Sequence, residues 1–241
     1  MINVVIPTKN PDTSIHDTIE NLLSIELINK IYVIDQSKVF NIKFCDKKIV
    51  HVKTYLPKSA ISARQYGAEM AINDKNICGI IFMDDDIVIQ HDNETMINLV
   101  NDLKNQDPVS FTVRQSHSRL LIFVKYLVEC TLKRGIFFDD RIVRNINLRL
   151  KKEFNIYTTS VSAGAMAIPI NYCLDGVMTL VKCRGYPIQA GDLELAQEIY
   201  NKYNKKFVAS DKYVAFHAPY DYRELDEKFY KARYDTKNVL N

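Results

Sequence analysis

Apolar runs alternate with amphipathic stretches over residues 3–104. Buried strands are predicted for the runs at 3–6, 31–34, 49–52 and 80–83. Helices are predicted where apolar residues recur at helical spacing between these runs, over 14–23, 59–72 and 93–104. Strands and helices in alternation are typical of an α/β fold with a mixed, mostly parallel sheet flanked by helices.

The second half of the chain has a less regular pattern. We expect a helix with a polar stripe over 120–132, a small-residue segment over 158–169, a helix over 189–204 and a surface helix in the tail from Asp221. The predicted organisation is a single domain, 1–241, with a first half, 1–113, and a second half, 114–241.

Three consecutive carboxylates, Asp84, Asp85 and Asp86, follow the fourth apolar run and precede another. Two adjacent carboxylates repel by roughly 1 kcal/mol in water and by ~4 kcal/mol in a partly buried site. A divalent cation offsets this repulsion, and Mg²⁺ or Mn²⁺ on one or two carboxylates usually completes its shell with substrate phosphates. The alternative is an acidic loop in open solvent.

The ends of the predicted strands carry polar side chains. Thr8, Asp35 and the acids at 84–86 each follow an apolar run. Ligands of parallel sheets bind beyond the carboxyl ends of the strands, so we expect these residues to form one active-site rim.

Composition adds few constraints. A length of 241 residues suits one domain with a sizeable core, and a net charge of +3 points to no class of partner. The five cysteines are odd in number and form no CxxC pair, which favours free thiols in a reducing compartment. Neither a signal peptide nor a membrane-spanning stretch is predicted, so we expect a cytoplasmic protein, without a nucleic-acid partner.

Six short segments together resemble the family 2 glycosyltransferases of the GT-A (Rossmann-like) fold, over about residues 2–200. They are VVIPTKN at 4–10, VIDQS at 33–37, SARQYG at 62–67, FMDDD at 82–86, AGAM at 163–166 and AGDLEL at 190–195. The fourth resembles the DXD motif of that family. Gln65 replaces the family's usual Asn, and Gly191 replaces the Glu before the presumed catalytic base.

The resemblance implies a metal-dependent, inverting glycosyltransferase that uses Mn²⁺ or Mg²⁺. Its donor would be a nucleoside diphosphate sugar, with UDP as the expected nucleotide. Its acceptor would be a hydroxyl of a glycan or lipid-linked molecule, in bacterial surface polysaccharide synthesis. The resemblance implies that Asp86 binds the metal, that Asp84 contacts metal or ribose, and that Asp85 contacts the donor or orients its neighbours.

Further donor-side roles are implied for residues of the first half. Asp35 would accept a hydrogen bond from the imide of uracil or thymine, while Pro7, Thr8 and Asn10 would line the base pocket. Arg64 would pair with the diphosphate. The alternatives are ordinary turn chemistry at Thr8, Asn10 and Asp35, and a surface salt bridge at Arg64.

The second half would supply the acceptor side and the base. Gly164 stands where the family has a Gly-rich strand. Asp192 is the candidate general base, unless it merely favours the positive end of its helix. His217 is a candidate third metal ligand, unless it is a packed or surface residue. The other four histidines, at 16, 51, 91 and 117, are assigned structural roles.

The segment 114–152 carries ten Lys or Arg residues against three acids. It would lie on the inner face of the cell membrane as a peripheral contact, or form a buried helix flanked by basic loops. Two alternatives to the transferase also stay open. One is a haloacid-dehalogenase-type phosphatase that uses Asp84 and Asp86, and the other is a non-catalytic module that binds a membrane or a partner.

Overall fold

A computed structural model describes residues 1–9, 14–37, 44–55, 60–114, 155–158, 164–180 and 190–217. Several predicted features lie outside these residues, namely Asn10, Ser59, the segment 115–152 with its helix at 120–132, and the tail from Asp221. None of the described helices is both long and apolar enough to cross a membrane.

The described residues of the first half form the four strands and three helices that the pattern predicts, together with two further strands at 87–89 and 109–114. The strands are β1 (Ile2–Thr8), β2 (Ile28–Asp35), β3 (Ile49–Lys53), β4 (Gly79–Met83), β5 (Ile87–Ile89), β6 (Val109–Arg114), β7 (Asn155–Thr158), β8 (Ala165–Pro169) and β9 (Phe207–His217). The helices are α1 (Ser14–Leu23), α2 (Ala60–Ala71), α3 (Asn93–Lys104), α6 (Ile170–Leu174), α7 (Val177–Leu180) and α8 (Ala190–Tyr203).

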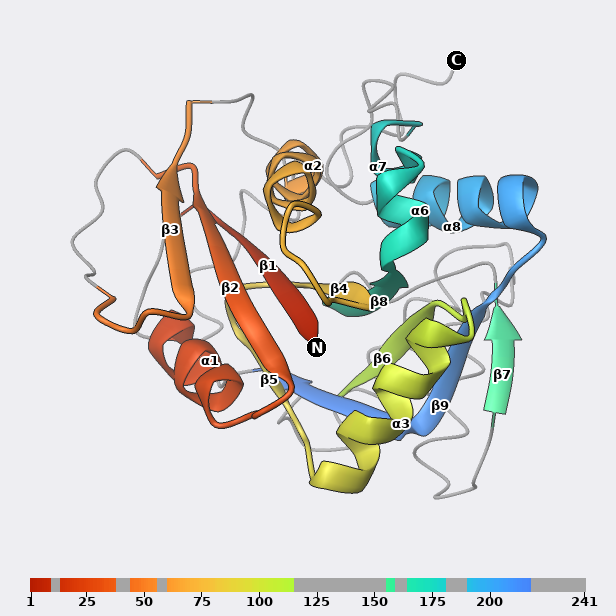
Figure 1. The fold of residues 1–241 in the computed structure, drawn as a ribbon, viewed down its shortest axis with the longest axis horizontal. Coiled ribbons are helices and arrows are strands. Elements are labelled where there is room, and N and C mark those ends of the chain that lie inside the picture. Colours follow the sequence, from red (N-terminus) through yellow and green to blue (C-terminus); the bar gives the residue numbers. More distant parts are fainter. Residues whose placement is uncertain are drawn as a thin grey trace, which may run out of the picture.

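These strands build one mixed sheet in the order β3-β2-β1-β4-β8-β6-β9-β5, with β7 paired to β9 (Figure 1). The neighbours β3, β2, β1 and β4 run parallel. β8 then pairs antiparallel with both β4 and β6, while β6 and β9 run parallel. The predicted mixed sheet flanked by helices is therefore confirmed.

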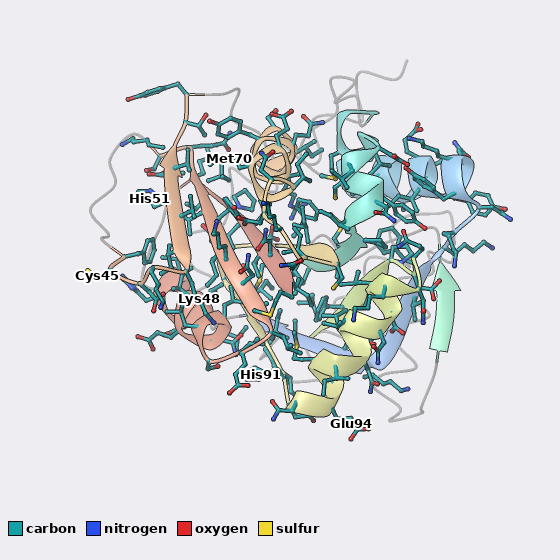
Figure 2. The ribbon with its side chains drawn as sticks, viewed as in Figure 1. Cys45, Lys48, His51, Met70, His91 and Glu94 are labelled. Atoms are coloured by element: carbon teal, nitrogen blue, oxygen red, sulfur yellow. The ribbon has the colours of Figure 1, made fainter. Side chains whose placement is uncertain are left out.

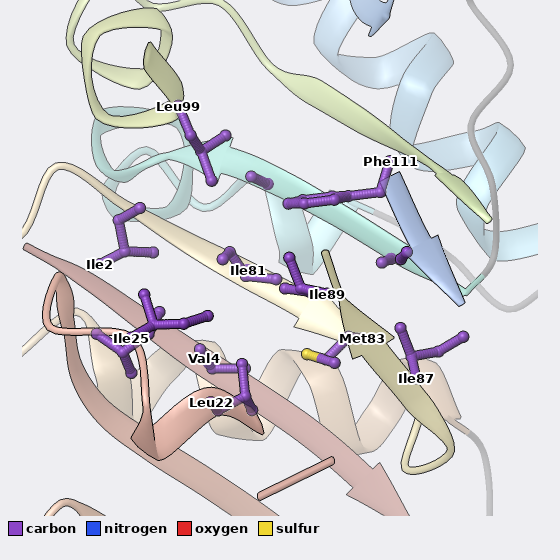
Figure 3. Packing of buried hydrophobic residues seen from close by; sticks show 14 of the residues in the cluster. Ile2, Val4, Leu22, Ile25, Ile81, Met83, Ile87, Ile89, Leu99 and Phe111 are labelled. Atoms are coloured by element: carbon purple, nitrogen blue, oxygen red, sulfur yellow. The ribbon is translucent and has the colours of Figure 1, made fainter. Parts of the chain in front are cut away.

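The central strands are apolar on both faces. Val4 and Ile6 of β1 pack in the core on the side of α1 and α3, whereas Val5 packs on the side of α2 and α8. Because successive side chains of a strand point to opposite faces, a continuous apolar run is the pattern of a strand covered on both sides. Figure 3 shows the first cluster, where Leu22 of α1 and Leu99 of α3 lie near Ile81 and Met83 of β4.

Helix α3 begins at the residue predicted for it. Asp92 caps the helix, because its carboxylate accepts a hydrogen bond of 2.7 Å from the backbone N–H of Thr95. Met96, Leu99 and Leu103 are buried at helical spacing, and this face packs beside β4 and β6. The predicted bounds of 93–104 are thus confirmed.

Helix α2 lies against β1 at very close range. A Cβ at Gly67 would lie 2.4 Å from Cγ1 of Val5 and 3.1 Å from Cγ1 of Ile34. No ordinary side chain fits in that space, so the glycine lets α2 approach β1 and β2.

Strand β5 lies at one edge of the sheet, and a side chain of α1 occupies its exposed side. The Asn21 amide donates to the backbone oxygen of Ile89 at 3.0 Å and accepts from the backbone N–H of the same residue at 2.9 Å. These two bonds reproduce what a neighbouring strand would offer.

Candidate active site

The carboxyl ends of the parallel strands β1, β2 and β4 lie side by side and form one rim of the sheet. β1 ends at Thr8, which is paired with Asp35 at the end of β2, and β4 ends one residue before Asp84. Asp85 and Asp86 form a turn between β4 and β5. The sequence-predicted residues Thr8, Asp35 and Asp84–Asp86 therefore share this edge.

Asp84 is held on both sides. Its backbone N–H donates to the oxygen of Gly164 at 2.9 Å, and its Oδ1 accepts from Nη2 of Arg64 at 2.8 Å. Arg64 reaches the edge from α2 and is only 4% exposed, so its ion pair is not a surface salt bridge. The Asp84 side chain keeps 35% of its surface exposed and remains accessible to a ligand.

Gly164 packs where a side chain would not fit without displacement. A Cβ at this position would lie 3.0 Å from Cγ2 of Val113 and 3.3 Å from Cδ1 of Ile87. The residue directly precedes β8, whose Ala165 is paired with Met83. A glycine here therefore brings the backbone of the second half against the acidic turn.

Asp85 is anchored by two threonines. The Thr8 hydroxyl donates to its Oδ2 at 2.5 Å, and the Thr18 hydroxyl of α1 donates to its backbone oxygen at 3.1 Å. Both threonines are buried. This pattern agrees with an orienting role for Asp85 and gives Thr8 a partner that the sequence did not predict.

Asp86 is buried, with 5% of its surface exposed, and lies beside the end of β9. β5 and β9 run antiparallel, with Ile87 opposite His217. The backbone of the predicted third metal ligand is thus next to that of the predicted first. Among the residues that the structure describes, no three His, Cys, Asp or Glu side chains already form a group that could hold a metal ion.

Asp35 is fully buried and hydrogen-bonded at both oxygens. Oδ1 accepts from the backbone N–H of Ser37 at 2.7 Å, an Asx-turn, and Oδ2 lies 3.3 Å from Nε2 of His51. His51 projects from β3 (Figure 2). The sequence assigned His51 a structural role, and the structure adds that its ring contacts a predicted site carboxylate.

The sequence contains only part of the signal for this contact, namely the alternation of side chains along each strand. β3 runs parallel to β2, with Val33 opposite His51 and Asp35 opposite Lys53. Alternate residues share a face of the sheet, so His51 and Asp35 lie on the same side once the register is known. Register between parallel strands cannot be read from the sequence of either strand.

The remaining predicted residues lie on β1, α8 and α2. Pro7 is buried and paired with Ile34, one residue before the strand ends. Asp192 lies in the first turn of α8. Gln65, the departure from the family pattern, donates to the backbone oxygen of Met178 at 2.6 Å and so joins α2 to α7.

Comparison with known proteins identifies the fold. No protein-family model and no curated protein sequence matches the chain. A crystal structure of GalNAc-T7 with UDP, GalNAc and Mn²⁺ aligns over 90% of this chain and 43% of that one, with a TM-score of 0.59 and 12% identity. A crystal structure of residues 1–349 of S. aureus TarS aligns over 100% of this chain and 65% of that one, with a TM-score of 0.55 and 14% identity. This chain spans less than two thirds of either neighbour. Both neighbours have the GT-A fold, and the predicted GT-A fold of this chain is confirmed.

Proposed function

We propose that this protein is a metal-dependent, inverting glycosyltransferase. It would transfer a sugar from a nucleoside diphosphate sugar, UDP-linked in our proposal, to a hydroxyl of a glycan or lipid-linked acceptor. We assign it to bacterial surface polysaccharide synthesis on the cytoplasmic side of the membrane, with 114–152 as a peripheral contact. The observation that carries the proposal is the convergence of Asp35, Arg64 and the acidic turn at one edge of a GT-A sheet.

The donor would lie along this edge from the end of β2 to the end of β4. Asp35 would accept a hydrogen bond from the base, in a pocket lined by Pro7, Thr8 and Asn10. The Asp84 side chain, which is 35% exposed, would contact the ribose or the metal. Arg64 would pair with the diphosphate. The GalNAc-T7 structure, which holds UDP and Mn²⁺, supports this assignment by its similar fold.

The chemistry of the acidic turn fits a divalent cation. Carboxylate oxygens and an imidazole suit Mn²⁺, and carboxylates with phosphates suit Mg²⁺. Asp86 and Asp84 would hold the cation, and His217 would add a third ligand from the paired strand β9. When bound, the cation stabilises negative charge on the departing diphosphate.

The transfer would be a single displacement. The acceptor oxygen attacks the anomeric carbon, its proton passes to the Asp192 carboxylate, and the bond from that carbon to the phosphate oxygen breaks with its electron pair on the diphosphate. Direct attack on the face opposite the leaving group inverts the anomeric configuration. Gly164 would belong to the acceptor side of the same site.

A thermal-shift screen tests the proposal. UDP, dTDP, GDP, ADP and CDP would be added with and without Mn²⁺, because a ligand that binds only the folded chain raises its Tm. We expect selective stabilisation by one nucleotide, dependent on Mn²⁺. The Asp86→Ala variant should lose the Mn²⁺-dependent part of that shift. Glu94→Ala, an exposed acid of α3 labelled in Figure 2, is the matched control and should keep it.

The same preparation separates the alternatives. Release of UDP from a UDP-sugar with Mn²⁺ supports the transferase. Phosphate release from a small phosphomonoester, without nucleotide release, would replace it with the phosphatase. A chain that neither binds nucleotides nor releases products would leave only a non-catalytic binding module.

A further inference from the structure

His51 contacts Asp35, the carboxylate that we propose binds the base. Its Nε2 lies 3.3 Å from Oδ2 of Asp35. A carboxylate has only acceptor atoms, so Nε2 must carry the proton in this contact. His51 therefore donates to Asp35 in this contact.

The ring of His51 is held in place by an aromatic neighbour. Phe44 packs against it edge to face, with ring centroids 6.1 Å apart and an interplanar angle of 82°. Phe44 is itself 5.9 Å from the ring of His16 on α1. The His51 side chain is 29% exposed, whereas the Asp35 side chain beside it is fully buried.

Two hydrogen-bond donors of the protein hold the Asp35 carboxylate. The backbone N–H of Ser37 occupies one side of Oδ1, and His51 occupies one side of Oδ2. A buried carboxylate without such donors would not keep its position, because burying an unpaired charge is costly. With them, both oxygens of Asp35 are held in one orientation inside a fully buried site.

We propose that His51 is a positioning residue that determines base specificity through Asp35. An acceptor-only carboxylate pairs with the imide N–H of uracil or thymine but faces a bare ring nitrogen, itself an acceptor, in cytosine. Loss of the His51 donor lets the Asp35 carboxylate rotate, so that its oxygens no longer face the imide position and UDP loses its advantage over CDP. This inference rests on the proposed nucleotide site and adds the residue that sets its selectivity.

The test is a calorimetric comparison of UDP and CDP, with Mn²⁺ present, for four chains. Wild type should prefer UDP. His51→Leu should lower that preference by about tenfold, which is the loss expected for one hydrogen bond to a charged group. His51→Gln should keep most of the preference, because a side-chain amide can donate to the same oxygen. His91→Leu is the control, since His91 contacts Ser24 outside the site.

A double-mutant cycle shows whether His51 acts through Asp35. Asp35→Asn presents an amide that can donate to cytosine, and it should shift the preference toward CDP. Adding His51→Leu to that variant should change the ratio by less than about twofold, because the carboxylate on which His51 acts is gone.

Three outcomes would overturn the inference. An unchanged UDP-to-CDP ratio in His51→Leu would remove His51 from specificity while leaving the nucleotide site intact. Equal wild-type affinity for UDP and CDP would remove base selection by Asp35. A wild-type chain that binds no nucleotide would overturn the proposed function itself, and this inference with it.

Discussion

The Thr8 hydroxyl donates to Oδ2 of Asp85 at 2.5 Å, which joins the end of β1 to the acidic turn that follows β4. The two residues are 77 positions apart in the sequence. The base pocket proposed around Thr8 and the cation site proposed around Asp86 therefore share a direct contact. We therefore expect a substitution in the base pocket to change cation binding, and a substitution in the cation site to change nucleotide binding.

Thr8→Val should weaken Mn²⁺-dependent nucleotide binding by about 10- to 100-fold. The methyl group that replaces the hydroxyl has similar volume, but the Asp85 carboxylate loses a donor, at a cost of about 1–3 kcal/mol for a bond to a charged group. Titration calorimetry of the nucleotide at several Mn²⁺ concentrations measures this. Thr8→Ser keeps the hydroxyl and should bind nearly as well as wild type. Equal affinity in Thr8→Val would mean that the contact does not position the turn.

Asp192→Asn should lower turnover by about 10²–10⁴-fold and leave donor affinity nearly intact. An amide cannot accept the proton of the acceptor hydroxyl, and none of the proposed donor contacts involves Asp192. Initial rates and nucleotide affinity are measured on the same preparation. Glu198→Gln, on the same helix, is the control. Normal rates in Asp192→Asn would transfer the role of base to another acid, with Glu194 as the first to test.

Asp74→Asn should destabilise the fold at pH 7 by about 1–3 kcal/mol. Burial raises the pKa of the Asp74 carboxyl, but hydrogen bonds from Lys30, Tyr32 and Asn3 outweigh this effect and lower the pKa overall. The carboxyl thus contributes stability above its unfolded pKa of about 4, and the contribution is lost as pH falls through the lowered folded value.

Urea unfolding at pH 7 and at pH 3 checks this sign. The stability difference between wild type and Asp74→Asn should be largest at pH 7 and should shrink in acid. Glu20→Gln, an exposed acid of α1, should differ little from wild type at either pH. A difference that grows in acid would contradict the lowered pKa.

Gly67→Ala should destabilise the chain by about 1–3 kcal/mol, although alanine is the better helix former by about 1 kcal/mol. The new methyl group would lie 2.4 Å from Val5, which forces α2 away from β1. The double variant Gly67→Ala with Val5→Ala should recover part of the loss if this clash is the cause. Thermal unfolding of the two variants measures the effect, and no recovery would point to another origin.

Local pattern was enough to predict the strands β1 to β4, the helix at 93–104 and the acidic turn. Each depends on neighbouring residues, such as the apolar run before Asp84 or the buried positions 96, 99 and 103. The carboxyl-edge placement of Thr8 and Asp35 followed from the rule for parallel strands.

Contacts within the rim could not be predicted in the same way. The pairs Arg64–Asp84, Thr8–Asp85 and His51–Asp35 depend on strand order and register, which set the neighbours of each side chain. The pairing of Ile87 with His217 depends on the fold in the same way, because β5 and β9 are far apart in the sequence. A single sequence specifies these arrangements only through the whole fold.

The hydrogen bonds between the Asn21 amide and Ile89 protect the chain against self-association. An unpaired strand border invites a second chain to extend the sheet, which is a common route to aggregation. The Asn21 side chain bonds both backbone groups of Ile89, so this residue of the edge strand beside the acidic turn cannot pair with a second chain. Loss of this amide would therefore expose a template for self-association.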